Sequence, residues 1–376
     1  MKQFRTISVM LVLLVLLAMF SGCGKPETAG TEAAATTTTP VTASLPILTT
    51  EAPTTVPVTT EPPTTEVPTT AAPETTTEPP LSEEELARLD FYDEFWELDP
   101  EQTDKWLEEN DALEDGYPGV YVNEAGIYDK GLDLYTIQGD QVVALDAENG
   151  ILIIRTQINH SNTVMAIAKR PGRLHLCEAA HIGSYGERIA SIAQRNNAVL
   201  AMTGSGFIDP NGNGNGGALA GYCMCSGRSY GSPMGWNYSR FELLENNWAI
   251  VSHADGPAAR ATTDCMEFQP AILIDGVKQS GGLWDDIDPR AAIGQNSHKD
   301  FLMVVVEGRY RDSPGCPVSK IADLMLKYDG INAMNVDGGT TAIMWYRGEI
   351  LNRCSNPRTP DGRYLPNAWV YKAKKN

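Results

Sequence analysis

Short apolar runs separated by turn residues dominate the sequence from Tyr117 onward. Residues 141–145 and 151–158 have the pattern of short β runs and lie on either side of Asn149-Gly150, which is a strong signal for a β-hairpin. Further runs of the same kind predict strands at 163–169, 198–202, 248–252, 271–274, 301–306, 333–336, 342–346 and 367–371.

Helical patterns are fewer among these strands. Residues 187–196 and 317–328 carry apolar side chains at helical spacing, and Gly330 follows the second of them as a helix stop. Many strands with few helices, in no strict alternation, predict the α+β class with mixed or antiparallel β-sheets. We therefore expect a single catalytic-type domain over residues 117–376.

A short helical extension is predicted before that domain, over residues 82–116. Ser82 and Glu85 form a capping box, and Asp99 followed by Pro100 is typical of a second helix start. The residues expected to face apolar neighbours are Leu86, Leu89, Phe95, Trp96 and Leu107. We give this extension a packing role and no chemistry.

Residues 1–22 have the composition of an export signal. Two basic residues precede an apolar run from Ile7 to Met19, which is too short to span a membrane. Phe20 to Cys23 resembles a bacterial lipobox, which implies cleavage before Cys23 and a diacylglyceryl group on its sulfur. Two acyl chains on one residue would give stable anchoring. The alternative is an ordinary signal peptide with a chance cysteine.

Residues 23–81 are predicted to be a disordered tether. Threonine, proline, alanine and glutamate dominate this segment, and such a composition cannot bury enough apolar surface to fold. Its prolines favour an extended chain. The expected location is therefore the outer face of the bacterial cytoplasmic membrane, with the domain displayed at the cell surface.

The most informative stretch lies between the predicted strands 333–336 and 342–346. Its connecting residues are Asp337, Gly338, Gly339, Thr340 and Thr341. Two glycines let the backbone take positive φ and approach a ligand closely, and successive free N–H groups make an anion-binding concavity. A carboxylate, two hydroxyls and the amide of Asn335 would converge there. The alternative is a plain hairpin whose Asp and Thr cap their own backbone.

The pattern N-x-D-G-G-x-[ST] before an apolar strand resembles the signature of the phosphodiester glycosidase family, whose members include an enzyme that removes N-acetylglucosamine from a sugar phosphodiester. Residues 198–209, 290–294 and 301–309 are similar to other family segments and occur in the same order. The resemblance covers about residues 140–374. Two departures stand out: Thr340 replaces a usual third glycine, and Thr203 replaces a usual asparagine.

The resemblance supplies positions for site residues, and residue chemistry suggests their roles. Glycosidases usually place two carboxylates around the scissile bond, and we expect Asp337 and Glu307 to be that pair, with Asp337 as nucleophile or base. Arg290 and Arg309 are expected to clamp phosphate oxygens through their planar guanidinium groups; the alternative for each is a structural ion pair. Further substrate contacts are expected from Asn335, Gly338, Gly339, Thr341, Thr203 and Gly204.

The glycine-rich segment 209–217 matches the first half of a calcium loop. Asp209, Asn211 and Asn213 could supply oxygen ligands, but Ala220 stands where a full EF-hand has a bidentate glutamate. The alternative is a loop of Asn-Gly turns. In either case its position after the segment 203–207 predicts a wall of the pocket. No other cofactor is expected.

Six cysteines remain once Cys23 is lipidated, at positions 177, 223, 225, 265, 316 and 354. An even number outside the membrane permits disulfides, with the pairing open. Cys223 and Cys225 are too close for an unstrained mutual bridge. A zinc site is the alternative, although the sequence lacks C-x-x-C or H-x-x-x-H spacing.

The formal net charge of −19 and a pI near 4.7 argue against nucleic acid as a partner. Contact with the membrane is expected only through the N-terminal lipid. These observations together predict a surface-anchored hydrolase that cleaves a sugar-1-phosphodiester in an exopolysaccharide, glycan or cell-wall polymer. The alternatives are a carbohydrate-binding or exopolysaccharide-biosynthesis accessory lipoprotein without turnover, and an adhesion module on a stalk.

Overall fold

The computed structural model describes residues 80–113, 117, 120–122, 131–235 and 237–374. The predicted export signal, the predicted lipid site at Cys23 and nearly all of the predicted tether lie outside these residues. Within the described ranges, no helix is both long enough and apolar enough to cross a membrane.

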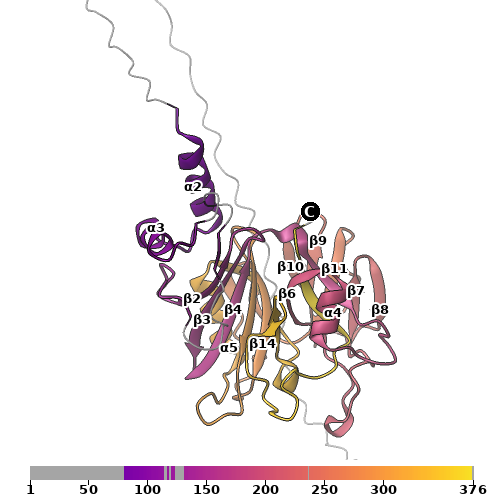
Figure 1. Ribbon diagram of the computed structural model, residues 1–376. Helices are drawn as coiled ribbons and strands as arrows, with labels where there is room; N and C mark the ends of the chain where they lie inside the picture. The colour runs from indigo at the N-terminus through magenta and orange to yellow at the C-terminus, as the bar shows by residue number, and fades with distance from the viewer. Residues whose placement is uncertain (1–79, 114–116, 118–119, 123–130, 236, 375–376) are drawn as a thin grey trace, which may run out of the picture. The chain divides into compact units, whose positions relative to one another are not determined.

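Three antiparallel sheets contain the described strands (Figure 1). The nine-stranded sheet has the order β1 (Tyr121–Val122), β2 (Gln141–Asp146), β3 (Ile151–Ile158), β4 (Ser161–Ala168), β15 (Phe301–Val306), β14 (Arg290–Asn296), β16 (Gly330–Val336), β12 (Ala271–Ile274), β13 (Val277–Lys278). The first five-stranded sheet has the order β10 (Ala249–His253), β9 (Ser239–Leu244), β11 (Thr262–Phe268), β7 (Tyr222–Cys225), β8 (Arg228–Gly231). The second has the order β18 (Glu349–Ile350), β17 (Met344–Tyr346), β6 (Ala198–Thr203), β19 (Asn367–Lys372), β5 (Leu174–Glu178).

Four α-helices accompany these sheets in the described part of the chain: α2 (Glu83–Glu94), α3 (Pro100–Glu109), α4 (Ile189–Arg195) and α5 (Val318–Lys327). The first two precede the sheets, and the last two lie where the sequence predicts helices. The predicted α+β class, with antiparallel sheets, few helices and a helical segment before them, is therefore confirmed.

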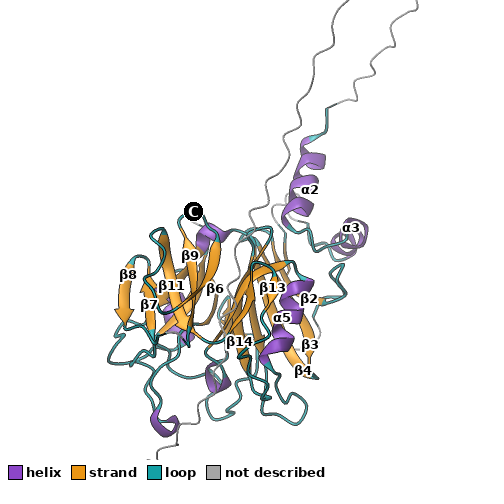
Figure 2. Ribbon diagram, turned by 180° about the vertical axis from the view of Figure 1, so that it is seen from behind, coloured by secondary structure: helices purple, strands orange, loops and turns teal. Residues whose placement is uncertain are grey.

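The core lies in layers between these elements. The largest cluster of buried side chains lies between one face of the nine-stranded sheet and the two smaller sheets, and includes Ile153, Ile293, Phe241 and Trp369. The opposite face of the nine-stranded sheet is covered by α5 (Figure 2) and by side chains of the helical extension. A smaller cluster lies beneath α4. Because both faces of the large sheet are covered, a strand such as β15 is apolar at every position.

The predicted hairpin around Asn149-Gly150 is formed by β2 and β3. Gly150 has a φ of +68°, a left-handed conformation that glycine adopts without strain. Asp146 accepts a hydrogen bond of 3.0 Å from the backbone N–H of Asn149. The local turn chemistry that the sequence indicates is therefore present.

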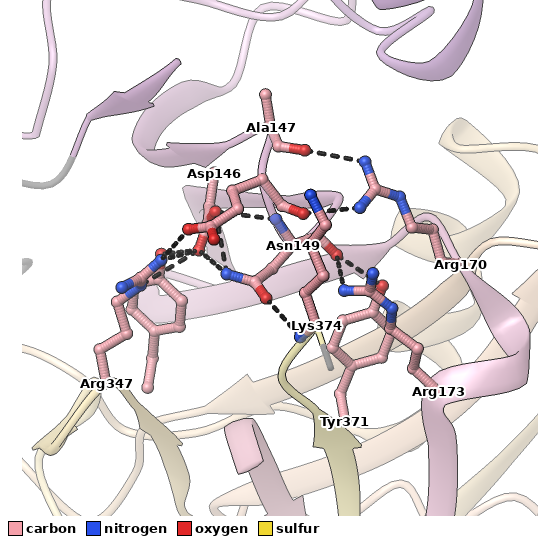
Figure 3. A network of polar contacts seen from close by, with 10 residues as sticks. Asp146, Ala147, Asn149, Arg170, Arg173, Arg347, Tyr371 and Lys374 are labelled. Atoms are coloured by element: carbon pink, nitrogen blue, oxygen red, sulfur yellow. Dashed lines mark hydrogen bonds and ion pairs between the residues drawn. The ribbon is translucent and has the colours of Figure 1, made fainter. Parts of the chain in front are cut away.

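The same turn is tied to the second five-stranded sheet (Figure 3). Arg347, which follows β17, pairs with Asp146 at 2.7 Å. The hydroxyl of Tyr371 in β19 donates to the carbonyl of Asn149 at 2.8 Å, and the backbone N–H of Lys374 donates to its side-chain oxygen at 3.1 Å. These contacts hold the turn between β2 and β3 of the nine-stranded sheet against the ends of β17 and β19 in the second five-stranded sheet.

The helical extension starts as predicted, but it packs differently. Ser82 and Glu85 form the capping box of α2, with the Glu85 N–H donating to the Ser82 hydroxyl at 3.2 Å. Phe95 is fully buried, as expected. Leu86 and Leu89 are about half exposed, so the prediction that they face apolar neighbours is wrong. The reason is that Phe91 of α2 and the following Phe95 contact the core, and the two leucines lie outside that contact.

A buried cluster of charges joins the extension to the large sheet. Lys169 lies at 2.6 Å from the carboxylate of Glu97 and at 3.0 Å from that of Asp300. The indole N–H of Trp96 donates to the same oxygen of Asp300 at 3.2 Å. All three charged side chains are almost completely removed from solvent.

The six cysteines within the described ranges are all free and buried, so none of the disulfides that their even number permits is formed in this structure. In the same ranges, no group of three or more His, Cys, Asp or Glu side chains is arranged to hold a metal ion.

Candidate active site

Asp337 lies where the chain passes from one sheet to another. β16 belongs to the nine-stranded sheet and β17 to the second five-stranded sheet, and a 3-10 turn at Gly339–Thr341 lies between them. Both predicted flanking strands are present. The hairpin part of the alternative is wrong, because the two strands pair within different sheets. Its capping part is present, because Asp337 accepts the N–H of Gly338 and the Thr341 hydroxyl donates to the carbonyl of Gly338.

The two glycines are required by this turn, but their N–H groups are occupied. Gly339 has a φ of +61°, and a Cβ on Gly338 would lie 2.8 Å from the carbonyl oxygen of Pro289. The N–H of Gly339 donates to Pro289 at 2.9 Å, and that of Gly338 donates to Asp337 at 3.1 Å. The anion-binding concavity of free N–H groups that the sequence suggests is therefore not formed by these two residues.

A cavity of about 600 Å³ opens beside the turn. The predicted catalytic and substrate-contact residues that line it are Asp337, Gly338, Gly339, Thr341 and Arg309, and the calcium candidates Asp209 and Asn213 line it as well. The other lining residues are Arg188, Phe207, Asp209, Gly212, Asn213, Gly214, Thr340, Asn356, Thr359, Gly362, Arg363 and Tyr364. The base of the cavity thus comes from strand ends, and most of its walls come from loops.

Asp337 is half-buried at the base of this cavity. Burial raises the pKa of Asp337 to about 7, although the Thr341 hydroxyl, the Gly338 N–H and the charge of Arg363 act in the opposite direction. Its own backbone N–H donates to the carbonyl of Gly204 at 3.3 Å. The carboxyl group therefore exchanges its proton near neutral pH, as a general acid or base must.

Asp209 is a second carboxylate in the cavity, in a different environment. Arg363 donates to its Oδ1 at 2.9 Å and also contacts its Oδ2, and the N–H of Gly214 donates to Oδ1 at 2.6 Å. The hydrogen bond from Arg363 is the main cause that lowers the pKa of Asp209. Two carboxylates whose pKa values are shifted in opposite directions are typical of a site in which one carboxyl group exchanges a proton and the other stays ionised.

Three arginines line the cavity, and they differ in their partners. Arg309 pairs with Asp288 at 2.9 Å, and Arg363 pairs with Asp209. Arg188 forms no ion pair with any carboxylate among the residues that the structure describes. Arg188 therefore adds a positive charge to the wall of the cavity.

The structure does not bring Arg290 and Asn335 into the cavity. Side chains alternate between the two faces of a sheet, and Arg290 shares its face with Ala292, which lies opposite Asn335 and packs beneath α5. On that face Arg290 pairs with Asp286 at 2.9 Å, and Asn335 donates to the carbonyl of Gln269 at 2.9 Å. Their backbones lie near the site, but their side chains contact other neighbours, and Arg290 forms the structural ion pair.

Glu307 lies just after β15 and is not among the residues that line the cavity. Its Oε1 accepts the backbone N–H of Arg353 at 2.7 Å, and its Oε2 lies 2.7 Å from the guanidinium of the same residue. Asn162 donates to Oε2 at 3.2 Å. Both oxygens are thus used to hold the start of the loop 352–363, and a catalytic role for Glu307 stays a prediction.

We expect Glu307→Gln to keep turnover within about tenfold of wild type and to lower the free energy of unfolding by about 1–3 kcal/mol, because the charged acceptor of Arg353 is lost. The measurements are kcat and urea unfolding. The matched control is Asp312→Asn, which removes an exposed partner of the same arginine and should leave the urea unfolding curve close to that of wild type. A loss of kcat beyond about 10²-fold with unchanged stability would instead support catalysis by Glu307.

Thr203 and Gly204 do not line the cavity. Thr203 is fully buried at the end of β6. A Cβ on Gly204 would lie 2.3 Å from the side-chain oxygen of Asn367. Gly204 supports the backbone of Asp337 through its carbonyl, and Thr203 donates its N–H to the carbonyl of Ile343. The structure does not place either residue where a substrate would touch it.

The loop 209–217 forms one wall of the cavity, as predicted. Its Asp209 carboxylate contacts the guanidinium of Arg363, and Asn213 donates to the backbone carbonyl of Asn211 at 3.2 Å. An arginine therefore occupies the place in which calcium would meet the carboxylate. This geometry favours the alternative of a glycine-rich loop over a calcium site at these three residues.

Sequence reasoning missed the wall formed by Arg188 and by the loop 355–364. The signal in the sequence is a run of turn residues and polar side chains, SNPRTPDGRY, between two strands. Irregular loops held by a rigid scaffold often carry function, so this run could have been singled out. Nothing local indicates that Arg188, which precedes α4, reaches the same cavity.

Comparisons with known proteins relate parts of the chain to one protein family and to several solved structures. No curated protein sequence matches the chain. Several solved structures are similar to it. The zebrafish N-acetylglucosamine-1-phosphodiester alpha-N-acetylglucosaminidase catalytic domain, auto-inhibited by its pro-peptide, has 15% identity and a TM-score of 0.49, covering 60% of this chain and 82% of that one.

Two more of these structures are a hypothetical protein from Synechocystis and a putative exported protein from Burkholderia pseudomallei. The first has 13% identity and a TM-score of 0.45, covering 61% of this chain and 63% of that one. The second has 13% identity and a TM-score of 0.41, covering 56% of this chain and 74% of that one. The model of the phosphodiester glycosidase family matches residues 196–372, which include Asp209, Asp337 and Arg363. Residues 196–372 therefore match the phosphodiester glycosidase family.

Proposed function

We propose that this protein hydrolyses a sugar-1-phosphodiester in an exopolysaccharide, glycan or cell-wall polymer. The observation that carries the proposal is one cavity in which Asp337, with a pKa near neutrality, lies among three arginines. A phosphodiester is anionic, and its cleavage at the sugar needs a group that activates water. The family match over residues 196–372 supports the same reaction class.

In the proposed reaction, ionised Asp337 accepts a proton from water as the water oxygen bonds to C1 of the sugar. The C1–O bond breaks, and its electron pair stays with the phosphate, which leaves as a phosphomonoester. Such a leaving group needs little protonation, so one carboxyl group near pH 7 suffices. Arg188, Arg309 and Arg363 hold the phosphate oxygens, where a planar guanidinium binds in a defined orientation.

We also propose that the protein acts outside the bacterial cytoplasmic membrane. The sequence of residues 1–22, the lipobox-like residues before Cys23 and the threonine- and proline-rich tether support an exported, lipid-anchored protein. A substrate in the envelope or capsule would then lie within reach of the domain.

The decisive experiment is hydrolysis of a panel of sugar-1-phosphodiesters in water labelled with ¹⁸O. Attack at C1 places the label in the released sugar, whereas attack at phosphorus places it in the phosphomonoester. Label in the sugar is the expected result. Label in the phosphate would overturn the proposal in favour of a phosphodiesterase, and binding without any turnover would favour the accessory carbohydrate-binding alternative.

The pH dependence of kcat/KM follows from the role of Asp337. The base must be ionised, and its pKa is about 7, so kcat/KM should rise with pH up to about 7 and then level off. An initial-rate series from pH 5 to about 9 measures it. A profile that falls as pH rises through 7 would show that the protonated form is required, and Asp337 would then be the general acid.

A further inference from the structure

Two cysteine side chains share one face of β7. Cys223 and Cys225 are two residues apart on this strand, and side chains at that spacing point to the same face. Both are fully buried in the largest core cluster, and both are free thiols. The interaction with Cys223, followed by burial, raises the pKa of Cys225. The two sulfur atoms therefore lie close to each other.

Met266 of β11 adds a third sulfur atom to this pair. It stands directly opposite Cys223 where β11 pairs with β7. Side chains of directly opposite residues lie on the same face of a sheet, with Cβ atoms about 4.5–5.5 Å apart. Met266 is also fully buried in the same cluster. Three sulfur atoms from two neighbouring strands thus meet in one region of the core that is closed to solvent.

Polar groups of β19 hold two of these sulfur atoms from the facing sheet. The side-chain N–H of Asn367 donates to the Sγ of Cys223 at 3.3 Å, and the indole N–H of Trp369 donates to the Sδ of Met266 at 3.2 Å. Asn367 and Trp369 are themselves fully buried. Outer hydrogen bonds of this kind orient metal ligands. The sulfur atoms are therefore positioned as ligands by a second layer of side chains.

We propose that Cys223, Cys225 and Met266 bind Cu(I) between the two five-stranded sheets. Thiolate and thioether sulfurs are soft ligands, which Cu(I) prefers. Structural zinc sites instead take four ligands from cysteine, histidine or carboxylate side chains. Here Met266 supplies the third ligand, so the site needs no third cysteine, histidine or carboxylate.

Binding changes the charge of the site in a defined way. Each thiol releases its proton to solvent, and each sulfur gives an electron pair to Cu(I). Two protons leave as one copper ion enters, so the site carries one negative charge when it is loaded. The side-chain N–H of Asn367 already points at the Cys223 sulfur and stabilises that charge.

The hairpin of β7 and β8 provides the route by which the metal enters. Cys225 is the last residue of β7, and the exposed residues Ser226 and Gly227 follow it. β8 is the last strand in the order of its sheet (Figure 1). Hairpins at such edges open locally at a lower free energy than central strands do. The inference does not depend on the proposed hydrolysis, because none of the three sulfur ligands lines the cavity of Asp337.

The test is a competition for Cu(I) between the protein and bicinchoninate, a chelator whose Cu(I) complex is coloured. The full chain is purified in detergent and titrated without oxygen, with ascorbate present to keep copper reduced. Wild type is expected to withdraw one Cu(I) ion per chain from the chelator. Because two protons are released, the association constant should rise about 10²-fold per pH unit below the pKa of the thiols.

Substitutions of the sulfur ligands identify the site. Cys223→Ala and Cys225→Ala should each weaken Cu(I) binding by at least about 10²-fold, since even the loss of an outer partner can cost that much. Met266→Leu keeps the apolar volume and should weaken binding by about tenfold. The matched control is Cys265→Ala, which removes a buried thiol from the other face of β11 and should bind Cu(I) as wild type does. An equal loss in Cys265→Ala would overturn the proposal.

X-ray absorption of the wild-type copper complex tests the ligands without any variant, so it decides the case in which a substitution prevents folding. Only sulfur is expected in the first coordination shell. Nitrogen or oxygen ligands would overturn the proposal, and so would a wild-type protein that leaves all the copper with bicinchoninate. Zn(II) bound as tightly as Cu(I) would overturn the assignment of the metal.

Discussion

Asp337→Asn is expected to lower kcat on a sugar-1-phosphodiester by about 10²–10⁴-fold, the range that a positioned general base contributes. The amide has nearly the size of the carboxyl group, but it cannot accept a proton from the attacking water. Substrate affinity should change little, because the arginines that hold the phosphate are untouched. Steady-state kinetics with the diester and calorimetric titration of the inactive variant measure the two effects.

The matched control is Asp323→Asn, which changes an exposed aspartate on α5 outside the cavity. It should keep wild-type kinetics. If Asp337→Asn keeps kcat within about tenfold of wild type, Asp337 takes no part in proton transfer, and Asp209 becomes the carboxylate to replace next.

The same substitution should stabilise the fold at high pH. The pKa of Asp337 is about 7 in the folded protein and 3.8 for an ordinary aspartate, so the folded protein loses stability as pH rises between those values. Asparagine carries no such charge. The Tm of Asp337→Asn should therefore exceed that of wild type at pH 8, with the gain shrinking towards pH 4. A difference in Tm that is the same at both pH values would contradict this expectation.

Lys169→Met is expected to lower the free energy of unfolding by about 3–5 kcal/mol, because removing one partner leaves a buried charge without compensation. Here two carboxylates, those of Glu97 and Asp300, would lose their shared cation. Burial raises the pKa of Glu97, and Lys169 opposes that shift. The loss should therefore be larger at pH 8 than at pH 5, where the carboxylates can take up protons. Urea unfolding at both pH values measures it.

The control for this change is Lys105→Met, which breaks an exposed pair with Glu109 on α3 and should alter stability by no more than about 0.5 kcal/mol. A loss below about 1 kcal/mol in Lys169→Met would mean that the buried cluster is not needed to hold the extension against the sheet.

Much of the fold could be predicted because its signals are local. Asn149-Gly150 sets the register of β2 and β3, Ser82 and Glu85 start α2, and helical spacing places α5. The site was only partly predictable. Asp337 and the glycines after it form a local turn and could be predicted. The face of the sheet on which the Arg290 side chain lies depends on how β14 pairs with β15 and β16, and the sequence around Arg290 does not specify that pairing.

The remaining site residues could not be placed from the sequence for a different reason. Arg188, Asp209 and Arg363 come from segments that are far apart along the chain and meet only after the sheets have packed. The sequence around Arg363 does not predict that Asp209 will be its ion-pair partner. Long-range contacts of this kind depend on loop paths, and loop paths are the part of a fold that periodicity does not describe.

The separation between strand ends at the base of the cavity and loops around its mouth has an evolutionary consequence. Loops tolerate insertion and exchange far better than the strands that support them. Proteins that descend from one ancestor could therefore change their specificity for the polymer substrate while they still cleave the same bond. Homologous proteins with identical turns after β16 and divergent segments at 181–188 and 355–364 are expected to catalyse the same reaction on different substrates.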